Sequence, residues 1–159
     1  ARREASSPTT GVAFTASRKS LTSAAPVFQN STGTEKGQLV KAWVNFNGFN
    51  VTSSSSMTGV ISSFNIAGVT DHATGDYTIT FPNGTFTNAN YCFAGALNNK
   101  IDNGNEMAGD TRGPVGIFQS FSAAPTTTTI RIETRYGADH DNAGGNYDFN
   151  NVYCIFFGG

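Results

Sequence analysis

The chain has 159 residues, of which 38% are hydrophobic, 12% aromatic and 13% charged, and its formal net charge is -1. One domain of this length buries about 68% of the surface that its unfolded chain exposes, which is enough for a core. The 10 Lys and Arg do not outnumber the 11 Asp and Glu, and no apolar run reaches the roughly 18 residues of a membrane helix, so we expect neither a nucleic-acid partner nor membrane insertion.

The first 38 residues differ in composition from the rest of the chain. They are rich in Ser, Thr, Ala and Gly, basic residues outnumber acidic ones, and the hydrophobic residues follow no period of a helix or a strand. Such a composition is typical of a segment without a core of its own. We therefore predict an extended arm or linker over residues 1–38 and a folded domain over residues 39–159.

From residue 39 onward, short runs of Val, Ile, Thr, Phe and Tyr are separated by Gly, Asn, Asp, Ser or Pro. This pattern is typical of strands and turns. It predicts seven strands, near residues 39–46, 60–67, 76–82, 90–97, 115–122, 127–136 and 150–157. Tyr77, Ile79 and Phe81 alternate with polar residues, as in an antiparallel sheet with one buried face. The expected fold is an all-β, jelly-roll-like antiparallel β-sandwich.

Two of the predicted strands are apolar on both faces. Val152, Cys154 and Phe156 project to one side of the last strand, and Tyr153, Ile155 and Phe157 project to the other. In the first strand, Leu39 and Trp43 lie opposite Val40 and Val44. A two-layer sandwich covers only the inner face of each sheet, so we expect another copy of the chain to cover the outer face. The alternative is that the arm folds back over it.

Four segments have a distinctive sequence: residues 41–48 (KAWVNFNG), 63–66 (SFNI), 69–79 (VTDHATGDYTI) and 152–158 (VYCIFFG). Together they make residues 39–159 resemble the C-terminal domain of many tail fibres of tailed bacteriophages, especially marine and cyanobacterial phages. The arm is not covered. His72 departs from the Asn that the family pattern has after Asp71, and the stretch 98–113 is longer than in the family.

The resemblance implies a homotrimeric fibre tip on the virion that attaches the particle to a host-surface glycan or an outer-membrane component. The strands that are apolar on both faces place Trp43, Tyr153, Ile155 and Phe157 in the predicted trimer interface. We expect the arm to contact other tail or fibre proteins. It carries over no catalytic residue and no cofactor. A purely structural virion protein, such as a decoration or fibre-connecting piece, is the alternative, and a glycan hydrolase is the third hypothesis.

Two loops, 98–113 and 136–148, combine aromatic side chains with hydrogen-bonding groups and are the predicted receptor-contact surface. The candidate receptor-binding residues are Asp102, Arg112, Tyr136, Asp139, His140 and Tyr147. Asn and Gly in such loops are also ordinary turn formers, which is the competing interpretation.

We expect no enzyme and no metal or organic cofactor. The acidic residues Asp102, Glu106, Asp110, Asp139 and Asp141 lie in segments that read as solvated turns, and glycoside hydrolysis needs two carboxyl groups about 5 to 9.5 Å apart. Residues 102–106 offer oxygen ligands suited to calcium but lack the EF-hand spacing. Cys92 and Cys154 do not fit the common zinc patterns, and we expect buried free thiols, with a bridge between them as the alternative.

Overall fold

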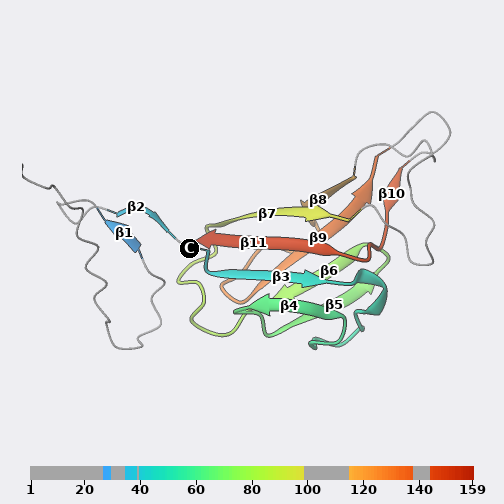
Figure 1. The fold of residues 1–159 in the computed structure, drawn as a ribbon, viewed down its shortest axis with the longest axis horizontal. Coiled ribbons are helices and arrows are strands. Elements are labelled where there is room, and N and C mark those ends of the chain that lie inside the picture. Colours follow the sequence, from blue (N-terminus) through green and yellow to red (C-terminus); the bar gives the residue numbers. More distant parts are fainter. Residues whose placement is uncertain (1–26, 30–34, 39, 99–114, 138–143) are drawn as a thin grey trace, which may run out of the picture.

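The computed structural model describes residues 27–29, 35–38, 40–98, 115–137 and 144–159. This part of the chain forms eleven strands and one short 3-10 helix (Figure 1). They are β1 (Val27–Gln29), β2 (Glu35–Gln38), β3 (Ala42–Phe46), η1 (Gly48–Asn50), β4 (Val60–Phe64), β5 (Gly68–Ala73), β6 (Asp76–Thr80), β7 (Tyr91–Leu97), β8 (Val115–Gln119), β9 (Thr129–Tyr136), β10 (Gly145–Asn146) and β11 (Val152–Gly158). No helix in the described ranges is long and apolar enough to cross a membrane.

The domain consists of two antiparallel sheets packed together, which confirms the predicted all-β fold. The first sheet has the strand order β4-β3-β11-β7. In the second, β5 pairs with β6 and β6 pairs with β9. The edge strand β8 also pairs with β9, and the short β10 pairs with the end of β9. The strands β1 and β2 form a separate hairpin.

The core lies between the sheets because their strands alternate buried and outward side chains. Val44, Cys154 and Phe156 are buried from the first sheet, and Ile79 and Ile132 from the second. Aromatic rings join the two layers edge to face: Phe46 and Tyr77 have ring centroids 5.0 Å apart, and Phe81 and Phe156 have centroids 4.9 Å apart. The predicted alternation of Tyr77, Ile79 and Phe81 is therefore confirmed.

The turn between β5 and β6 requires a glycine. Gly75 has a φ of 66°, and a Cβ at this position would lie 2.5 Å from the Thr134 carbonyl oxygen and from the Tyr147 nitrogen. Only glycine combines this backbone conformation with so close an approach of two other segments. The TGDYT segment thus has a structural role where β6, β9 and the chain before β11 meet.

Three expectations from the sequence were wrong in detail. The strand β5 was not predicted, because Val69 is its only large apolar side chain that is buried and no period-two pattern marks it. The first strand of the domain begins at Ala42, and Val40 is 40% exposed instead of facing the core. Both thiols are free and Cys154 is buried, as expected, but Cys92 is exposed, because it pairs with Phe157 on the outer side of the first sheet. Leu39 lies outside the described residues.

Candidate binding groove

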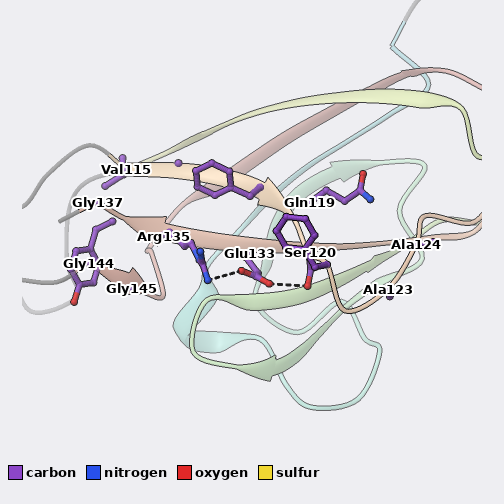
Figure 2. Close-up of a pocket in the computed structure, with 14 residues that line it drawn as sticks. Val115, Gln119, Ser120, Ala123, Ala124, Glu133, Arg135, Gly137, Gly144 and Gly145 are labelled. Carbon is purple, nitrogen blue, oxygen red and sulfur yellow. Dashed lines mark hydrogen bonds and ion pairs between the residues drawn. The ribbon is translucent and has the colours of Figure 1, made fainter.

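A groove of about 1040 Å³ opens on the second sheet, beside the turn that joins β8 and β9 (Figure 2). The register of these strands places Phe118 opposite Glu133 and Gly116 opposite Arg135. Side chains directly opposite each other in an antiparallel pair share a face of the sheet. The groove is lined by Val115, Gly116, Phe118, Gln119, Ser120, Phe121, Ala123, Ala124, Glu133, Arg135, Tyr136, Gly137, Gly144 and Gly145.

Two phenylalanines present their rings to solvent in this groove. Phe121, in the turn after β8, is fully exposed, and Phe118 is 54% exposed. A Cβ on Gly116 would lie 2.9 Å from the Phe118 ring, so the glycine leaves room for the ring to lie along its own strand. Exposed aromatic side chains gathered beside polar groups are typical of a contact surface for a ligand or partner.

Polar side chains hold one another in place next to these rings. Glu133 Oε1 accepts a hydrogen bond from the Ser120 hydroxyl at 2.9 Å, and Glu133 Oε2 lies 3.1 Å from Arg135 Nη2. Arg135 Nε donates to Asn146 Oδ1 at 2.6 Å. Figure 2 shows Glu133 between Ser120 and Arg135. The groove therefore contains a carboxylate and a guanidinium that neutralise each other and have fixed positions.

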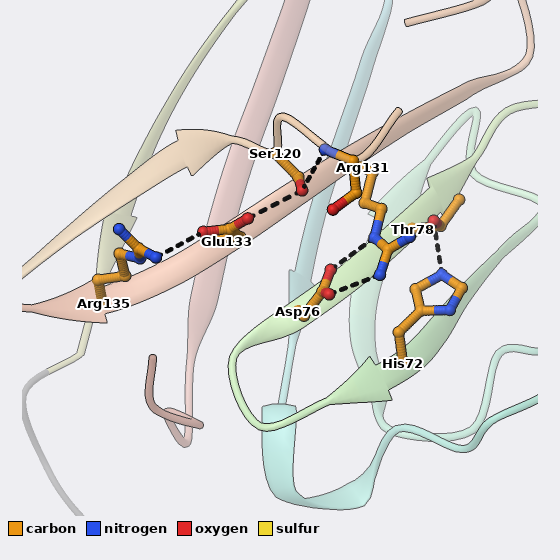
Figure 3. A network of polar contacts seen from close by, with 8 residues as sticks. His72, Asp76, Thr78, Ser120, Arg131, Glu133 and Arg135 are labelled. Carbon is orange, nitrogen blue, oxygen red and sulfur yellow. Dashed lines mark hydrogen bonds and ion pairs between the residues drawn. The ribbon is translucent and has the colours of Figure 1, made fainter. Parts of the chain in front are cut away.

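A second ion pair, between Arg131 and Asp76, lies on the same face of the sheet. Arg131 donates to both carboxylate oxygens of Asp76, from Nε at 2.8 Å and from Nη2 at 2.6 Å (Figure 3). These hydrogen bonds raise the pKa of the Arg131 guanidinium. His72 Nε2 and the Thr78 hydroxyl lie 2.8 Å apart on the neighbouring strands. Each acidic side chain on this part of the face is therefore matched by a basic one.

A buried polar network supports the floor of the groove from behind. The Tyr77 hydroxyl donates to Asp148 Oδ1, which also accepts from the Gly75 nitrogen at 2.7 Å. Burial first, and then the Asp148 hydrogen bond, raise the pKa of Tyr77, so the hydroxyl keeps its proton. Thr134 Oγ1 donates to the Tyr147 carbonyl at 2.6 Å. These contacts hold the segment around Asn146, the partner of Arg135.

Of the predicted receptor-binding residues, two lie in the described part of the chain. Tyr136 lines the groove. Tyr147 packs behind it, with its ring centroid 5.8 Å from that of Tyr136 and 5.4 Å from that of Phe149. Four residues lie outside the described ranges: Asp102, Arg112, Asp139 and His140. A receptor-binding role for all six stays a prediction.

Reasoning from the sequence missed the residues that form most of the groove. Phe118, Ser120 and Phe121 come from a segment that the sequence predicts only as the end of a strand. Glu133, which accepts the hydrogen bond of Ser120, follows 13 residues later. The alternation of β9 did place Glu133 and Arg135 on a polar face. A second signal in the sequence was the pair Phe118 and Phe121, two phenylalanines close together where the strand ends and the turn begins.

The outer face of the first sheet is mostly apolar, with Asn45 and Ser62 as polar side chains in one row of it. Its strands β3, β4, β7 and β11 contain no Asp, Glu, Lys, Arg or His. The register forms one row across the sheet, in which Trp43 pairs with both Phe64 and Ile155. Phe64 is 50% exposed, Tyr153 and Ile155 are each 41% exposed, and Trp43 and Phe157 are half-buried. We call these five residues the apolar outer face.

Within the described ranges, no three His, Cys, Asp or Glu side chains lie close enough together to form a set of metal ligands. The predicted calcium-binding loop, residues 102–106, lies outside those ranges.

Comparisons of the chain with protein-family models, curated proteins and solved structures found no match.

Proposed function

We propose that this chain is the attachment domain of a phage tail fibre, carried on the virion, and that its β-sandwich binds a receptor on the host surface. The observation that carries the proposal is the groove in which Phe118 and the fully exposed Phe121 lie beside the Glu133–Arg135 pair. A receptor that covers these rings removes apolar surface from water. The sequence resemblance supports the same function.

Binding is a better fit to the groove than hydrolysis. Glu133 is the one carboxylate among its described lining residues, and both of its oxygens already contact Ser120 or Arg135. Glycoside hydrolases usually employ a pair of carboxyl groups, one of which must exchange a proton. A paired, hydrogen-bonded carboxylate is better suited to orienting a ligand than to transferring protons.

The proposal includes a homotrimer assembled through the apolar outer face. Among the described residues, no third layer covers Trp43, Tyr153 and Ile155. The strands of this face contain no charged side chain that would have to be desolvated on association. Three grooves on one tip, and several fibres on one particle, turn weak single contacts into firm attachment. The arm, residues 1–38, then joins the tip to other tail or fibre proteins.

The test is adsorption of the fluorescently labelled full chain to a panel of bacterial strains, followed by competition with phage on the strains that bind it. We expect the protein to bind susceptible cells and to block infection. Phe121→Ala should lower cell binding about tenfold or more. Met57→Ala is the matched control, because Met57 is 46% exposed and is not among the residues that line the groove, and it should bind as the parent chain does.

Other outcomes favour the alternatives. A chain that copurifies with particles and never competes for cells would be a purely structural virion protein. Release of reducing sugar from host polysaccharide would indicate a hydrolase.

Light scattering tests the trimer. It should give three times the 16.8 kDa mass of one chain, and a stable monomer at micromolar concentration would contradict the trimer.

A further inference from the structure

Among the described residues, the charges in and around the groove are compensated in pairs. Glu133 is matched by Arg135 within 3.1 Å, and Asp76 is matched by Arg131 within 2.6 Å. An anionic ligand that is attracted by Arg135 would also be repelled by Glu133. A cationic ligand that is attracted by Glu133 would likewise be repelled by Arg135. A site of this kind gives no net electrostatic advantage to a charged ligand.

The polar pair retains hydrogen-bonding capacity on the side that faces the groove. A carboxylate has about four lone-pair sites and a guanidinium has five N–H donors, and the contacts with Ser120, Arg135 and Asn146 use only part of each. The side chain of Arg135 is 52% exposed and that of Glu133 is 15% exposed, so a ligand can reach both. An acceptor and a donor held side by side match groups that both donate and accept, and hydroxyls on adjacent carbons are such groups.

The rings next to this pair supply an apolar surface. Phe118 is 54% exposed and Phe121 is fully exposed, and Gly116 leaves room for the Phe118 ring beside the strand. A sugar ring has one face made of C–H groups and an edge made of hydroxyls. The groove offers aromatic faces for the first and the Glu133–Arg135 pair for the second.

We infer that the groove binds an uncharged sugar residue of a host-surface glycan, with Phe118 and Phe121 against the ring and Glu133 and Arg135 bonded to its hydroxyls. This inference rests on the proposed attachment function and narrows its receptor class. Acidic sugars and surface proteins are thereby set aside, and both appear as outcomes of the test.

The test measures binding of the full chain to a printed array that pairs neutral oligosaccharides of glucose, galactose, mannose and N-acetylglucosamine with versions that carry uronate, sialate or phosphate. We expect retention on neutral spots, and a signal that half-molar salt changes by less than about twofold, since screening acts on charge interactions. Phe121→Ala should lower that signal about tenfold or more, whereas Met57→Ala should leave it unchanged. Since Phe121 is fully exposed, its truncation removes no core contact.

Binding confined to acidic spots, binding that disappears in salt, equal binding by Phe121→Ala, or no retention on any neutral spot would each overturn the inference. The cell assay separates this failure from failure of the proposed function. If the chain adsorbs to cells through Phe121 while every neutral spot stays empty, attachment stands and the neutral sugar is wrong. Adsorption that protease treatment of the cells abolishes would assign the receptor to a surface protein instead.

Discussion

Removing the Tyr77 hydroxyl isolates the buried network that supports the groove. Tyr77 is fully buried, and its hydroxyl donates to Asp148, which also accepts from the Gly75 nitrogen at 2.7 Å. Tyr77→Phe keeps the ring, and with it the edge-to-face contact with Phe46 at 5.0 Å. The substitution therefore removes the hydrogen bond to Asp148 and leaves the apolar packing in place.

The expected cost follows from the charge of the acceptor. A hydrogen bond to a charged group contributes about 1.5–3 kcal/mol, and its loss leaves a carboxylate less well satisfied, so Tyr77→Phe should lower the free energy of unfolding by about 2 kcal/mol. Tyr91 offers a matched comparison, because its hydroxyl donates at 3.0 Å to the neutral carbonyl of Thr129. Tyr91→Phe should cost about 1 kcal/mol. Met57→Ala, at a site that is 46% exposed and belongs neither to the groove nor to the apolar outer face, should cost less than about 0.5 kcal/mol.

Urea titration followed by tryptophan fluorescence measures the three differences. All proteins are compared at one concentration, because association adds to the apparent stability. The slope of the unfolding free energy against urea should be unchanged, since the surface exposed on unfolding is nearly the same. We expect the largest loss for Tyr77→Phe, a smaller loss for Tyr91→Phe and the smallest for Met57→Ala.

A Tyr77→Phe variant as stable as the parent chain would refute the reasoning, because the Tyr77–Asp148 hydrogen bond would then contribute nothing beyond what water provides. Equal losses for Tyr77→Phe and Tyr91→Phe would refute the part that depends on the charge of the acceptor.

Three further predictions concern a carboxyl group, the thiols and the apolar outer face. Burial, and then Asp148, raise the pKa of Asp71 above its ordinary 3.8, so the folded chain binds the extra proton and its stability falls as the pH rises through the window above 3.8. Asp71→Asn should flatten this fall in urea titrations across that window, and an unchanged profile would contradict it. Burial raises the pKa of Cys154 to about 12, so a maleimide should label Cys154 only after unfolding. The exposed Cys92 should react in the folded chain, and more slowly as rising protein concentration covers the outer face. Mass spectrometry of labelled peptides checks both, and rapid labelling of Cys154 in the folded chain would contradict the prediction. Ile155→Glu places a charge on the apolar outer face at a 41% exposed site. Light scattering should then show loss of the trimer, while circular dichroism should still show a folded β protein. A trimer that persists would exclude this face as its interface.

The fold class and most strands follow from local pattern. Tyr77 and Ile79, or Ile130 and Ile132, recur with period two, and a strand with one buried face requires that period. The strand β5 could not be predicted in this way, since its pairing with β6 depends on backbone hydrogen bonds that carry no side-chain signal. The two-sided character of β11 was also readable, and Tyr153 and Ile155 are exposed as the alternation predicts.

The groove could not be predicted, because its parts meet only through strand pairing. Ser120 and Glu133 are 13 residues apart, and Arg135 and Asn146 are 11 residues apart, and neither spacing forms a motif. Nothing in the local sequence separates an outward Glu133 that faces solvent from one that is held between a hydroxyl and a guanidinium. Cys92 shows the same limit, since its apolar neighbours favour burial and its register with Phe157 places it outside.

The amino-acid sequence by itself determined that this chain forms antiparallel strands with alternating faces and that its last strand is apolar on both sides. Only the tertiary structure decided which outward residues share a surface, and so where the groove, the paired charges and the apolar outer face lie. The physical reason is that side-chain alternation is a property of one strand, whereas register belongs to a pair of strands, and a slip of one residue would exchange every face.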